Sequence, residues 1–474
     1  MTNNILLLAS IFLLLSCGRQ ANETASTPPN VVILLADQWR AQATGYAGDP
    51  NVKTPHLDRL AAESVNFPNA VSGTPVCCPF RASMMTGQRP LTHGVFMNDV
   101  QLDTNAVSMG KVFAAAGYDT GYIGKWHLDG HGRLQFIPPG NRRQGFQYWK
   151  GNECTHDYNH SVYYDQDNPE PQTWETYDAF AQTEDAIQYL QNRTGKEKPF
   201  LLVLSWGTPH APYHTAPEQY RNQYDSAAMV LRPNVPAELA GQVKKDLTGY
   251  YAHATALDDM IGKLREVLNQ TGLADNTIVL FTADHGDLLG SQGAYKKQQA
   301  YDESIKVPML YYVPPAYAQP GTKEALLNSE DILPTLLGLC QIPIPETVEG
   351  TNYGDYILGK EQVVDTVALI SCVQPFGQWN KVKHGAREYR GLRTLRYTYT
   401  RDLSGPWLLF DNEKDPYQMQ NLVDEPAYEA IKRSLDQLLT EKLAANGDKF
   451  LPGLAYIEQW QYPIDETGTV PYFH

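Results

Sequence analysis

The sequence predicts an α/β protein, in which a large doubly wound, mixed or parallel sheet is flanked by helices and a smaller antiparallel sheet with one helix follows. Three apolar, β-rich runs end in Asp, His or Gly and indicate buried parallel strands at residues 30–40, 199–212 and 276–287. Apolar residues recur at three- and four-residue spacing in the segments between these runs. Strands that alternate with helices are typical of a doubly wound sheet.

The helical spacing predicts helices at residues 55–67, 107–116, 173–191 and 244–268. The pattern changes after about residue 345. Short alternating runs there, "VALISCV", "EYRGLRTLRYTYTRD" and "WLLFDN", predict antiparallel strands, and residues 428–444 predict a helix. We therefore predict an α/β domain at residues 30–360 and a smaller C-terminal subdomain at residues 361–474.

Composition limits the classes of partner. A chain of 474 residues can bury a large core, and its formal charge of −15 argues against nucleic acid, which needs clustered Lys and Arg over the binding face. An anionic substrate must therefore meet a local positive pocket.

The first 29 residues look like a targeting segment. The apolar run at residues 5–15 is too short to span a bilayer and is typical of a signal peptide. Its end, "LLSCG", resembles a bacterial lipobox, with cleavage before Cys17 and lipid on the Cys17 sulfur; the alternative is an ordinary secretory signal. We predict a signal peptide and lipobox at residues 1–17 and a flexible tether at residues 18–29. This places the protein in the periplasm or on the outer membrane or cell surface of a Gram-negative bacterium, held to the membrane by lipid alone, where its remaining thiols leave room for one unassigned disulfide.

Two acids at predicted strand ends suggest a metal site. Asp37 and Asp284 each follow a buried strand, where an unpaired carboxylate is costly. Together with the neighbouring Gln38 and His285 they offer a mainly oxygen donor set, which suits Ca²⁺, or alternatively Mg²⁺ or Mn²⁺, better than Zn²⁺. One such Asp alone would more often cap a helix or turn, but two at one sheet edge favour the metal.

Cationic and imidazole side chains recur near the same predicted edge. Lys125 and His127 stand two residues apart in "GKWH", His210 stands between prolines in "TPHAP", and Lys297 precedes a predicted turn or helix. Any one of them would more often be structural or solvated. Together with Arg81 they would form a pocket that neutralises a tetrahedral anion beside a metal.

Two adjacent cysteines, Cys77 and Cys78, stand in "CCPFRASMMTG". Adjacent cysteines rarely bond to each other because the trans peptide holds their side chains in a poor geometry. A zinc site would need a second ligand pair, but the other cysteines stand singly, at positions 17, 154, 340 and 372. Either at least one of the two is reactive, or both are small buried hydrophobes.

The run Cys77-x-Pro79-x-Arg81 followed by Thr86-Gly87 resembles the signature of the type I sulfatases, the formylglycine-dependent family of the alkaline phosphatase superfamily. The motifs "ADQWR", "GKWH", "PHAP", "ADHGD" and "K…YDES…VP" appear in the family's order over nearly the whole mature chain. The tail "YRGLRT…YTYTRD…LFDNEKDPYQ" resembles that of bacterial polysaccharide sulfatases. The resemblance implies that residues 30–360 are the catalytic domain.

The resemblance also implies roles for these residues. Cys77 is oxidised to formylglycine by a formylglycine-generating enzyme or an anaerobic sulfatase-maturing enzyme, and the hydrated aldehyde attacks sulfur. Cys78 is then a packing residue, and Arg81 holds the modified side chain. Lys125 and Lys297 hold sulfate oxygens, His127 takes the proton that lets sulfate leave, and His210, with Lys297, protonates the leaving alkoxide. The metal ligands are Asp37, Gln38, Asp284, His285 and the modified Cys77.

One departure from the family pattern keeps a second activity open. Many members have Asp where this chain has Gln38 and Asn where it has His285, and the pair found here resembles the branch with choline sulfatases and phosphonate monoester hydrolases. We predict a sulfatase of sulfated carbohydrate, with a phosphonate or phosphate ester hydrolase as the alternative. A catalytically silent glycan-binding lipoprotein is a third interpretation, which the intact Lys125, His127, His210 and Lys297 disfavour.

A basic stretch supplies the predicted contact with the rest of the substrate. Residues 381–401 carry seven Lys and Arg against one Glu, which is a local excess in an acidic chain. Arginine suits bidentate binding of carboxylates and sulfates. We predict that one or two of these four residues contact the sugar: Lys383, His384, Arg387 and Arg390.

Overall fold

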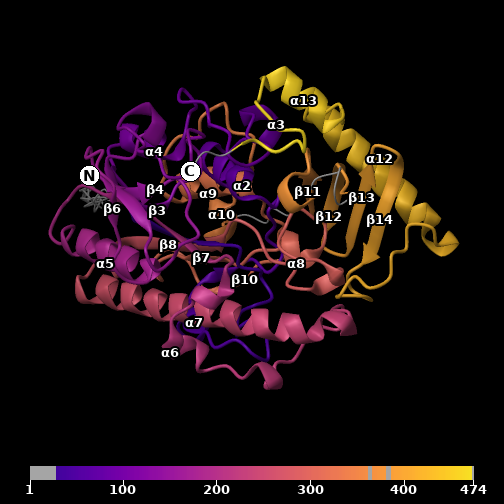
Figure 1. Ribbon diagram of the computed structural model, residues 1–474. Helices are drawn as coiled ribbons and strands as arrows, with labels where there is room; N and C mark the ends of the chain where they lie inside the picture. Colours follow the sequence, from indigo (N-terminus) through magenta and orange to yellow (C-terminus); the bar gives the residue numbers. More distant parts are fainter. Residues whose placement is uncertain (1–27, 361–365, 380–385, 472–474) are drawn as a thin grey trace, which may run out of the picture.

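The computed structural model describes residues 28–360, 366–379 and 386–471, and the strands within them form two sheets. The large sheet contains β1 (Asn30–Asp37), β2 (Val65–Asn66), β3 (Asp119–Lys125), β4 (Tyr148–Asn152), β5 (Val162–Asp165), β6 (Gln172–Thr173), β7 (Phe200–Pro209), β8 (Thr277–Ala283), β9 (Met309–Tyr312) and β10 (Gly321–Thr322). Its strand order is β10-β2-β9-β8-β1-β7-β3-β4-β5-β6. The small sheet, at one side of the molecule in Figure 1, has the order β11-β12-β13-β14, with β11 (Val367–Cys372), β12 (Tyr389–Thr394), β13 (Tyr397–Asp402) and β14 (Gly405–Asp411).

The centre of the large sheet is parallel. β1 pairs in parallel with both β7 and β8, with Leu34 opposite Leu204 on one side and Phe281 on the other. β3 pairs in parallel with β7 and β4, whereas β9 runs antiparallel to β8. Every residue of β1, β7 and β8 is buried, as the continuous apolar runs predict for strands covered on both faces. The predicted mixed, doubly wound sheet is confirmed, and the carboxyl ends of its central strands meet at one edge.

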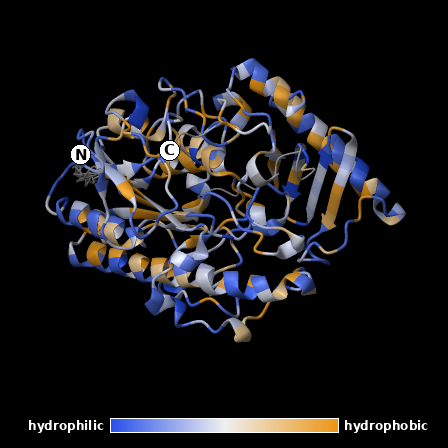
Figure 2. Ribbon diagram, viewed as in Figure 1, coloured by the Kyte–Doolittle hydropathy of each residue, from blue (hydrophilic) through white to orange (hydrophobic). Residues whose placement is uncertain are grey.

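Helices cover both faces of this sheet. The α-helices of the described residues, including α12 beside the small sheet, are α1 (Pro55–Ala62), α2 (Cys77–Thr86), α3 (Pro90–His93), α4 (Met109–Ala115), α5 (Asp178–Gln191), α6 (Glu218–Arg221), α7 (Ala240–Gln270), α8 (Asp302–Ile305), α9 (Ile332–Leu339), α10 (Gly354–Ile357), α12 (Glu429–Ala445) and α13 (Gly453–Trp460). In Figure 1, α5 and α7 lie on one side of the sheet and α2, α4 and α9 on the other. Figure 2 shows the central strands mainly in hydrophobic colours, whereas α7 alternates between hydrophobic and hydrophilic residues, as a helix between core and solvent does.

Two predicted helix boundaries are wrong. The helix predicted at residues 55–67 ends at Ala62, because Val65 and Asn66 pair with β9 as β2. The helix predicted at residues 173–191 begins at Asp178, because Gln172 and Thr173 pair with β5. In both places strand pairing outweighs the local helical spacing.

The small antiparallel sheet and its helix were also predicted, and they are confirmed. One face of the sheet packs through Ile370, Tyr389 and Phe410 on residues of the α/β part, which include Val71, Ala300, Ile305 and Leu326. The other face packs through Leu392, Tyr399 and Leu409 on one stripe of α12, formed by Leu435, Leu439 and Leu443. Alternate side chains of β12 therefore pack on the α/β part and on α12.

The predicted signal peptide, tether and lipidation site at Cys17 lie outside the described residues, and they stay predictions, as does the domain division at residue 360. Over the part of the chain that the structure describes, no helix combines the length and apolar character needed to cross a bilayer. The five described cysteines are free and buried, so they form no disulfide with one another.

A buried ion pair joins the small sheet to the α/β part, and removing it should destabilise the protein. Arg393 of β12 donates from Nε and Nη2 to the two carboxylate oxygens of Asp302 in α8, at 2.9 and 3.0 Å. Burial alone would raise the pKa of Asp302, but Arg393 outweighs it and lowers that pKa. We expect Arg393→Ala to leave a buried unpaired carboxylate and to lower the free energy of unfolding by about 3–5 kcal/mol, measured by denaturant titration.

The matched control is Arg401→Ala on β13, whose partner Asp436 is partly exposed. A loss of no more than about 1 kcal/mol is expected there. Equal losses in the two variants would contradict the role of the Arg393–Asp302 pair.

Candidate active site and metal centre

The carboxyl ends of four adjacent parallel strands bring the predicted site residues together. Asp37 ends β1, Lys125 ends β3, His210 follows β7 and Asp284 follows β8. The Asp284 N–H donates to the carbonyl of Ala36 at 3.2 Å, which keeps the two aspartates on neighbouring chain segments. Both carboxylates are fully buried.

Cys77 begins α2 and points at this cluster. Its Sγ lies 3.2 Å from Lys297 Nζ, 3.3 Å from His285 Nε2, 3.8 Å from Lys125 Nζ and 4.0 Å from Asp37 Oδ1. Burial and the Asp37 carboxylate would raise the pKa of the Cys77 thiol, but Lys125, Lys297 and His285 outweigh them and lower it well below its ordinary value. The thiol therefore stands in an electropositive environment at the amino end of a helix, which favours reactivity.

Cys78 has a different environment. Its backbone N–H donates to Asn98 Oδ1 at 3.0 Å, and its sulfur accepts from the Asp99 N–H at 3.4 Å. The side chain is fully buried in the main hydrophobic core, and burial raises its pKa. Position 78 thus has the environment of a packing residue.

Arg81 holds the two carboxylates in place. It lies one helical turn after Cys77 and is fully buried. Nη2 donates to Asp284 Oδ2 at 3.0 Å and to Asp37 Oδ2 at 3.2 Å, and Nε donates to the same Asp284 oxygen at 3.1 Å. Nη1 donates to Ser205 Oγ at 2.8 Å and to the carbonyl of Lys125 at 2.9 Å. One guanidinium therefore connects α2 with β1, β3, β7 and β8.

The side chains around Cys77 fit a divalent cation. Ligand atoms of Asp37, Cys77, Asp284 and His285 all lie within 4.8 Å of one another, and all four residues are buried. His285 Nδ1 lies 2.9 Å from its neighbour's carbonyl oxygen, an acceptor that fixes the proton on Nδ1 and leaves Nε2 free as a ligand. Two carboxylates with an amide and an imidazole suit a hard cation.

Gln38 offers the amide oxygen. It has φ +65°, a conformation that non-glycine residues rarely adopt, and its N–H donates to Asp284 Oδ1 at 3.0 Å. Its Nε2 donates to Asp287 Oδ2 at 2.6 Å, and its Oε1 lies 3.4 Å from Lys297 Nζ. The amide orientation is thus fixed with the oxygen toward the cluster. Sequence analysis missed Asp287 in this role, although it stands in the quoted run "ADHGD".

A cavity of about 330 Å³ opens above Cys77. Lys125, His127, His210 and Lys297 all line it, as predicted from the motifs. Lys125 Nζ donates to Asp37 Oδ2 at 2.6 Å, and Lys297 Nζ lies 3.1 Å from His210 Nε2. Burial, reinforced by Lys297, lowers the pKa of His210 well below its ordinary value. His210 is therefore neutral, and it lies next to Lys297, which can supply a proton.

Asp99, Arg133 and His156 are among the polar residues of this cavity that the motifs did not predict. His127, at φ +57°, places Nε2 3.2 Å from Asp99 Oδ1, and Arg133 forms a two-pronged contact with the same carboxylate at 2.8 and 2.9 Å. His156 stacks on His210, with ring centroids 4.7 Å apart. All three lie on irregular segments, where no periodicity marks them. The pair Asp99–Arg133 positions His127.

The C-terminal part supplies one wall of the cavity. Phe376, Gly377, Trp379 and Thr469 line it. The Gly377 N–H donates to Thr469 Oγ1 at 3.0 Å, so the two wall segments are tied together.

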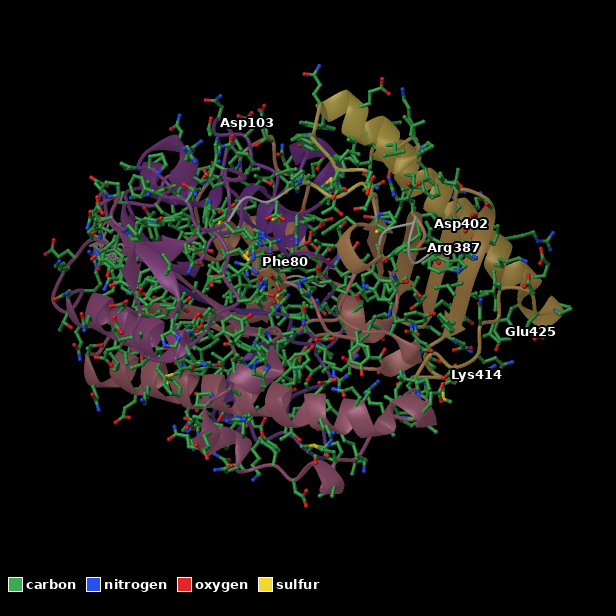
Figure 3. All side chains as sticks on the ribbon, viewed as in Figure 1. Phe80, Asp103, Arg387, Asp402, Lys414 and Glu425 are labelled. Carbon is green, nitrogen blue, oxygen red and sulfur yellow. The ribbon has the colours of Figure 1, made fainter. Side chains whose placement is uncertain are left out.

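The structure describes two of the four predicted sugar-contacting residues, Arg387 and Arg390. Lys383 and His384 lie outside the described residues. Arg387 pairs with Asp402 at 2.5 Å, and Arg390 pairs with Asp448 at 2.5 Å; neither lines the cavity above Cys77. Figure 3 shows Arg387 beside Asp402 on the small sheet, whereas Phe80 of α2 lies nearer the middle of the molecule.

Comparison with known proteins agrees with this geometry. The family model described as sulfatase matches residues 29–342, and a model described as the C-terminal part of N-sulphoglucosamine sulphohydrolase matches residues 290–445. An ulvan-active sulfatase of Formosa agariphila is 46% identical over 98% of this chain and 91% of its own length. An endo-4-O-sulfatase of Bacteroides thetaiotaomicron is 31% identical over 87% of this chain and 92% of its own length.

A solved structure gives the same result. The putative sulfatase yidJ from Bacteroides fragilis superposes with a TM-score of 0.82 at 32% identity, over 93% of this chain and the whole of that one. The model match, the identity and the superposition all extend through the strand ends that carry the site. This chain belongs to the sulfatase family of the alkaline phosphatase superfamily, and it is a sulfuric ester hydrolase.

Proposed function

We propose that this enzyme removes sulfate from a sulfated polysaccharide, and that ulvan or its oligosaccharides are the substrate. The observation that carries the proposal is the position of Cys77 at the floor of a cavity between two lysines, Lys125 and Lys297. The 46% identity with an ulvan-active sulfatase supports ulvan over the substrate of the endo-4-O-sulfatase, which is only 31% identical.

Cys77 is the proposed precursor of formylglycine, made by a formylglycine-generating or anaerobic sulfatase-maturing enzyme. Three features support this choice over Cys78. Only Cys77 stands in register with Pro79 and Arg81, its side chain lines the cavity, and its pKa is lowered, whereas Cys78 is packed in the core.

The proposed cation site consists of Asp37, Gln38, Asp284, His285 and the side chain at position 77. Ca²⁺ is the first choice because the donors are mainly carboxylate and amide oxygens, with Mg²⁺ and Mn²⁺ as alternatives. Together, the bound cation and the hydrated formylglycine supply an activated oxygen nucleophile.

The side chains of the cavity have separate tasks in the proposed reaction. Lys125 and Lys297 bind sulfate oxygens, and Arg81 keeps the two carboxylates and α2 in register. His210, next to Lys297, delivers a proton to the oxygen of the leaving sugar. His127 accepts the proton released when sulfate departs, and Asp99 holds its other nitrogen.

The alternative remains hydrolysis of phosphonate or phosphate esters at the same site. Gln38 and His285 are both neutral as ligands, so the site carries fewer negative charges than one with Asp and Asn at the corresponding positions. A less negative site binds a more highly charged anion more readily. Relative rates on matched esters distinguish the two activities.

For localisation we propose a lipoprotein, with lipid on Cys17, at the periplasmic side or the cell surface of a Gram-negative bacterium. The apolar run at residues 5–15 and the "LLSCG" sequence support this proposal. A polysaccharide too large to enter the cell would be degraded in such a place.

The maturation site can be tested by mass spectrometry of active protein. We expect peptides with formylglycine at position 77 and a thiol at position 78. Cys77→Ala should lower kcat/KM by at least about a thousandfold, because the nucleophile is lost. The matched control, Cys78→Ala, removes a buried sulfur and should keep most of the activity. An active preparation with an unmodified thiol at Cys77 would overturn this assignment.

The cation can be tested by elemental analysis. We expect about one Ca²⁺ per chain, loss of activity after dialysis against a chelator and recovery on addition of Ca²⁺. Asp284→Asn should bind the ion substoichiometrically and lower kcat/KM by at least about a hundredfold. Asp331→Asn is the control, since Asp331 is a buried acid that accepts the backbone N–H groups of Asn328 and Thr351. Full activity without any bound metal would exclude the proposed centre.

The substrate class can be tested with desalted oligosaccharides of ulvan and of chondroitin sulfate. We expect release of free sulfate, measured by ion chromatography, from the ulvan fragments at a rate at least about tenfold higher. On small esters, kcat/KM should be higher for an aryl sulfate than for the aryl phosphate and phenylphosphonate. The reverse order on small esters would assign the enzyme to the alternative activity.

A further inference from the structure

A second cavity adjoins the catalytic one. It measures about 600 Å³, and the two share Asp99 as a lining residue. At two other places, residues that are adjacent in the chain line one cavity and the other. Thr469 lines the catalytic cavity and Val470 the second, and Cys154 lines the catalytic cavity and Glu153 the second. The two cavities are therefore neighbours, and the second lies beside the reaction site where an adjoining sugar of the substrate would extend.

Trp460 and Tyr462, at the end of α13, form an aromatic wall of this second cavity. Their rings stack with centroids 6.2 Å apart and an angle of 19° between planes. Tyr462 donates its hydroxyl to the Gly94 carbonyl at 3.0 Å, and a Cβ placed on Gly94 would lie 2.6 Å from the Trp460 ring. Because Gly94 has no side chain, the Trp460 ring can pack directly against the Gly94 backbone. Both rings are partly exposed and held in place, which suits the apolar face of a sugar ring.

The charges of the two cavities differ. The catalytic cavity is lined by Lys125, Arg133, Lys296 and Lys297. Among the described residues that line the second cavity, none is a Lys or an Arg, and the acids there are Asp99, Asp103 and Glu153. Asp103 is exposed, and Figure 3 shows it on the outer surface of the molecule. Asp99 is paired with Arg133, and Glu153 accepts three backbone N–H groups, so a sulfate or a carboxylate in the second cavity would find no lysine or arginine of that lining to balance its charge.

We propose that the second cavity binds an uncharged, unsulfated sugar residue next to the sulfated residue of the substrate, with its ring against Trp460 and Tyr462. The inference rests on the proposed function as a polysaccharide sulfatase. The second cavity makes the enzyme selective for the sugar that adjoins the sulfated residue. A neutral neighbour is accepted, and a uronic acid or a second sulfated residue is disfavoured.

The test uses matured enzyme and three probes that carry the same sulfated residue, identified by mass analysis of the ulvan products. The probes are its methyl glycoside and two disaccharides, with xylose or with glucuronic acid as the neighbour. These two neighbours differ only by the carboxylate on C5. We expect kcat/KM to be highest for the xylose disaccharide, by at least about tenfold over the other two probes.

Trp460→Ala should lower kcat/KM on the xylose disaccharide by about tenfold more than it lowers the value on an aryl sulfate. The matched control is Trp407→Ala, which removes a partly exposed tryptophan of the small sheet outside both cavities and should leave the ratio between probes unchanged. Gln101→Lys places a cation in the second cavity and should move the preference toward the glucuronic acid disaccharide by about tenfold. This variant keeps the inference testable even if Trp460→Ala does not fold.

Equal kcat/KM on the three probes would overturn the inference, as would an unchanged preference in Gln101→Lys. Failure of the proposed function would look different. In that case no sulfated carbohydrate is turned over, while a small sulfate, phosphate or phosphonate ester still is.

Discussion

The ion pairs of Arg81 with Asp37 and Asp284 are the interaction on which the rest of the site depends. Two carboxylates at adjacent buried strand ends would repel each other and would have lost their hydration, a combination that costs several kcal/mol unless cations compensate. Arg81 bridges them from α2, and because it lies one turn after Cys77 the same contact determines where Cys77 points. Removal of one partner of such a buried pair typically costs about 3–5 kcal/mol, so the geometry of the reactive side chain is coupled to the stability of the sheet edge.

This arrangement also explains how an acidic protein can select an anionic substrate. The net charge is −15, yet Asp99 in the lining of the cavity is paired with Arg133, and Lys125 and Lys297 lie close to Cys77. Lys297 contacts Cys77, Gln38 and the neutral His210 rather than a carboxylate, so its charge stays available to a ligand. Local pairing rather than net charge thus decides what enters the cavity.

The sequence predicts those site residues that regular secondary structure positions. Parallel strands end at one edge, so the apolar runs that end in Asp37 and Asp284 predict that these residues lie together. The places of Arg81 and the histidines are implied by the resemblance of ordered motifs. Asp99 and Arg133 could not be found in this way, because they meet across irregular loops. In the basic stretch at residues 381–401, the described Arg387 and Arg390 have acidic partners at Asp402 and Asp448. A local excess of charge in the sequence does not show which of its arginines are paired in the fold.

The C-terminal wall of the cavity is joined to Lys297, a proposed catalytic residue, through its neighbour in the chain. Gln298, directly after Lys297, exchanges two hydrogen bonds of 3.2 Å with the backbone of Phe376, and this contact fixes the wall segment that carries Phe376 and Gly377. The same wall is tied to Thr469, where the catalytic cavity ends and the second one begins. Asp37, Lys125 and Asp284 thus come from the parallel strand ends and Cys77 from α2, whereas the wall that would meet the rest of the sugar chain comes from irregular C-terminal segments. Since those C-terminal segments carry none of the proposed catalytic or cation-binding residues, their side chains and the sugars they accept can change while the chemistry at the strand ends stays the same.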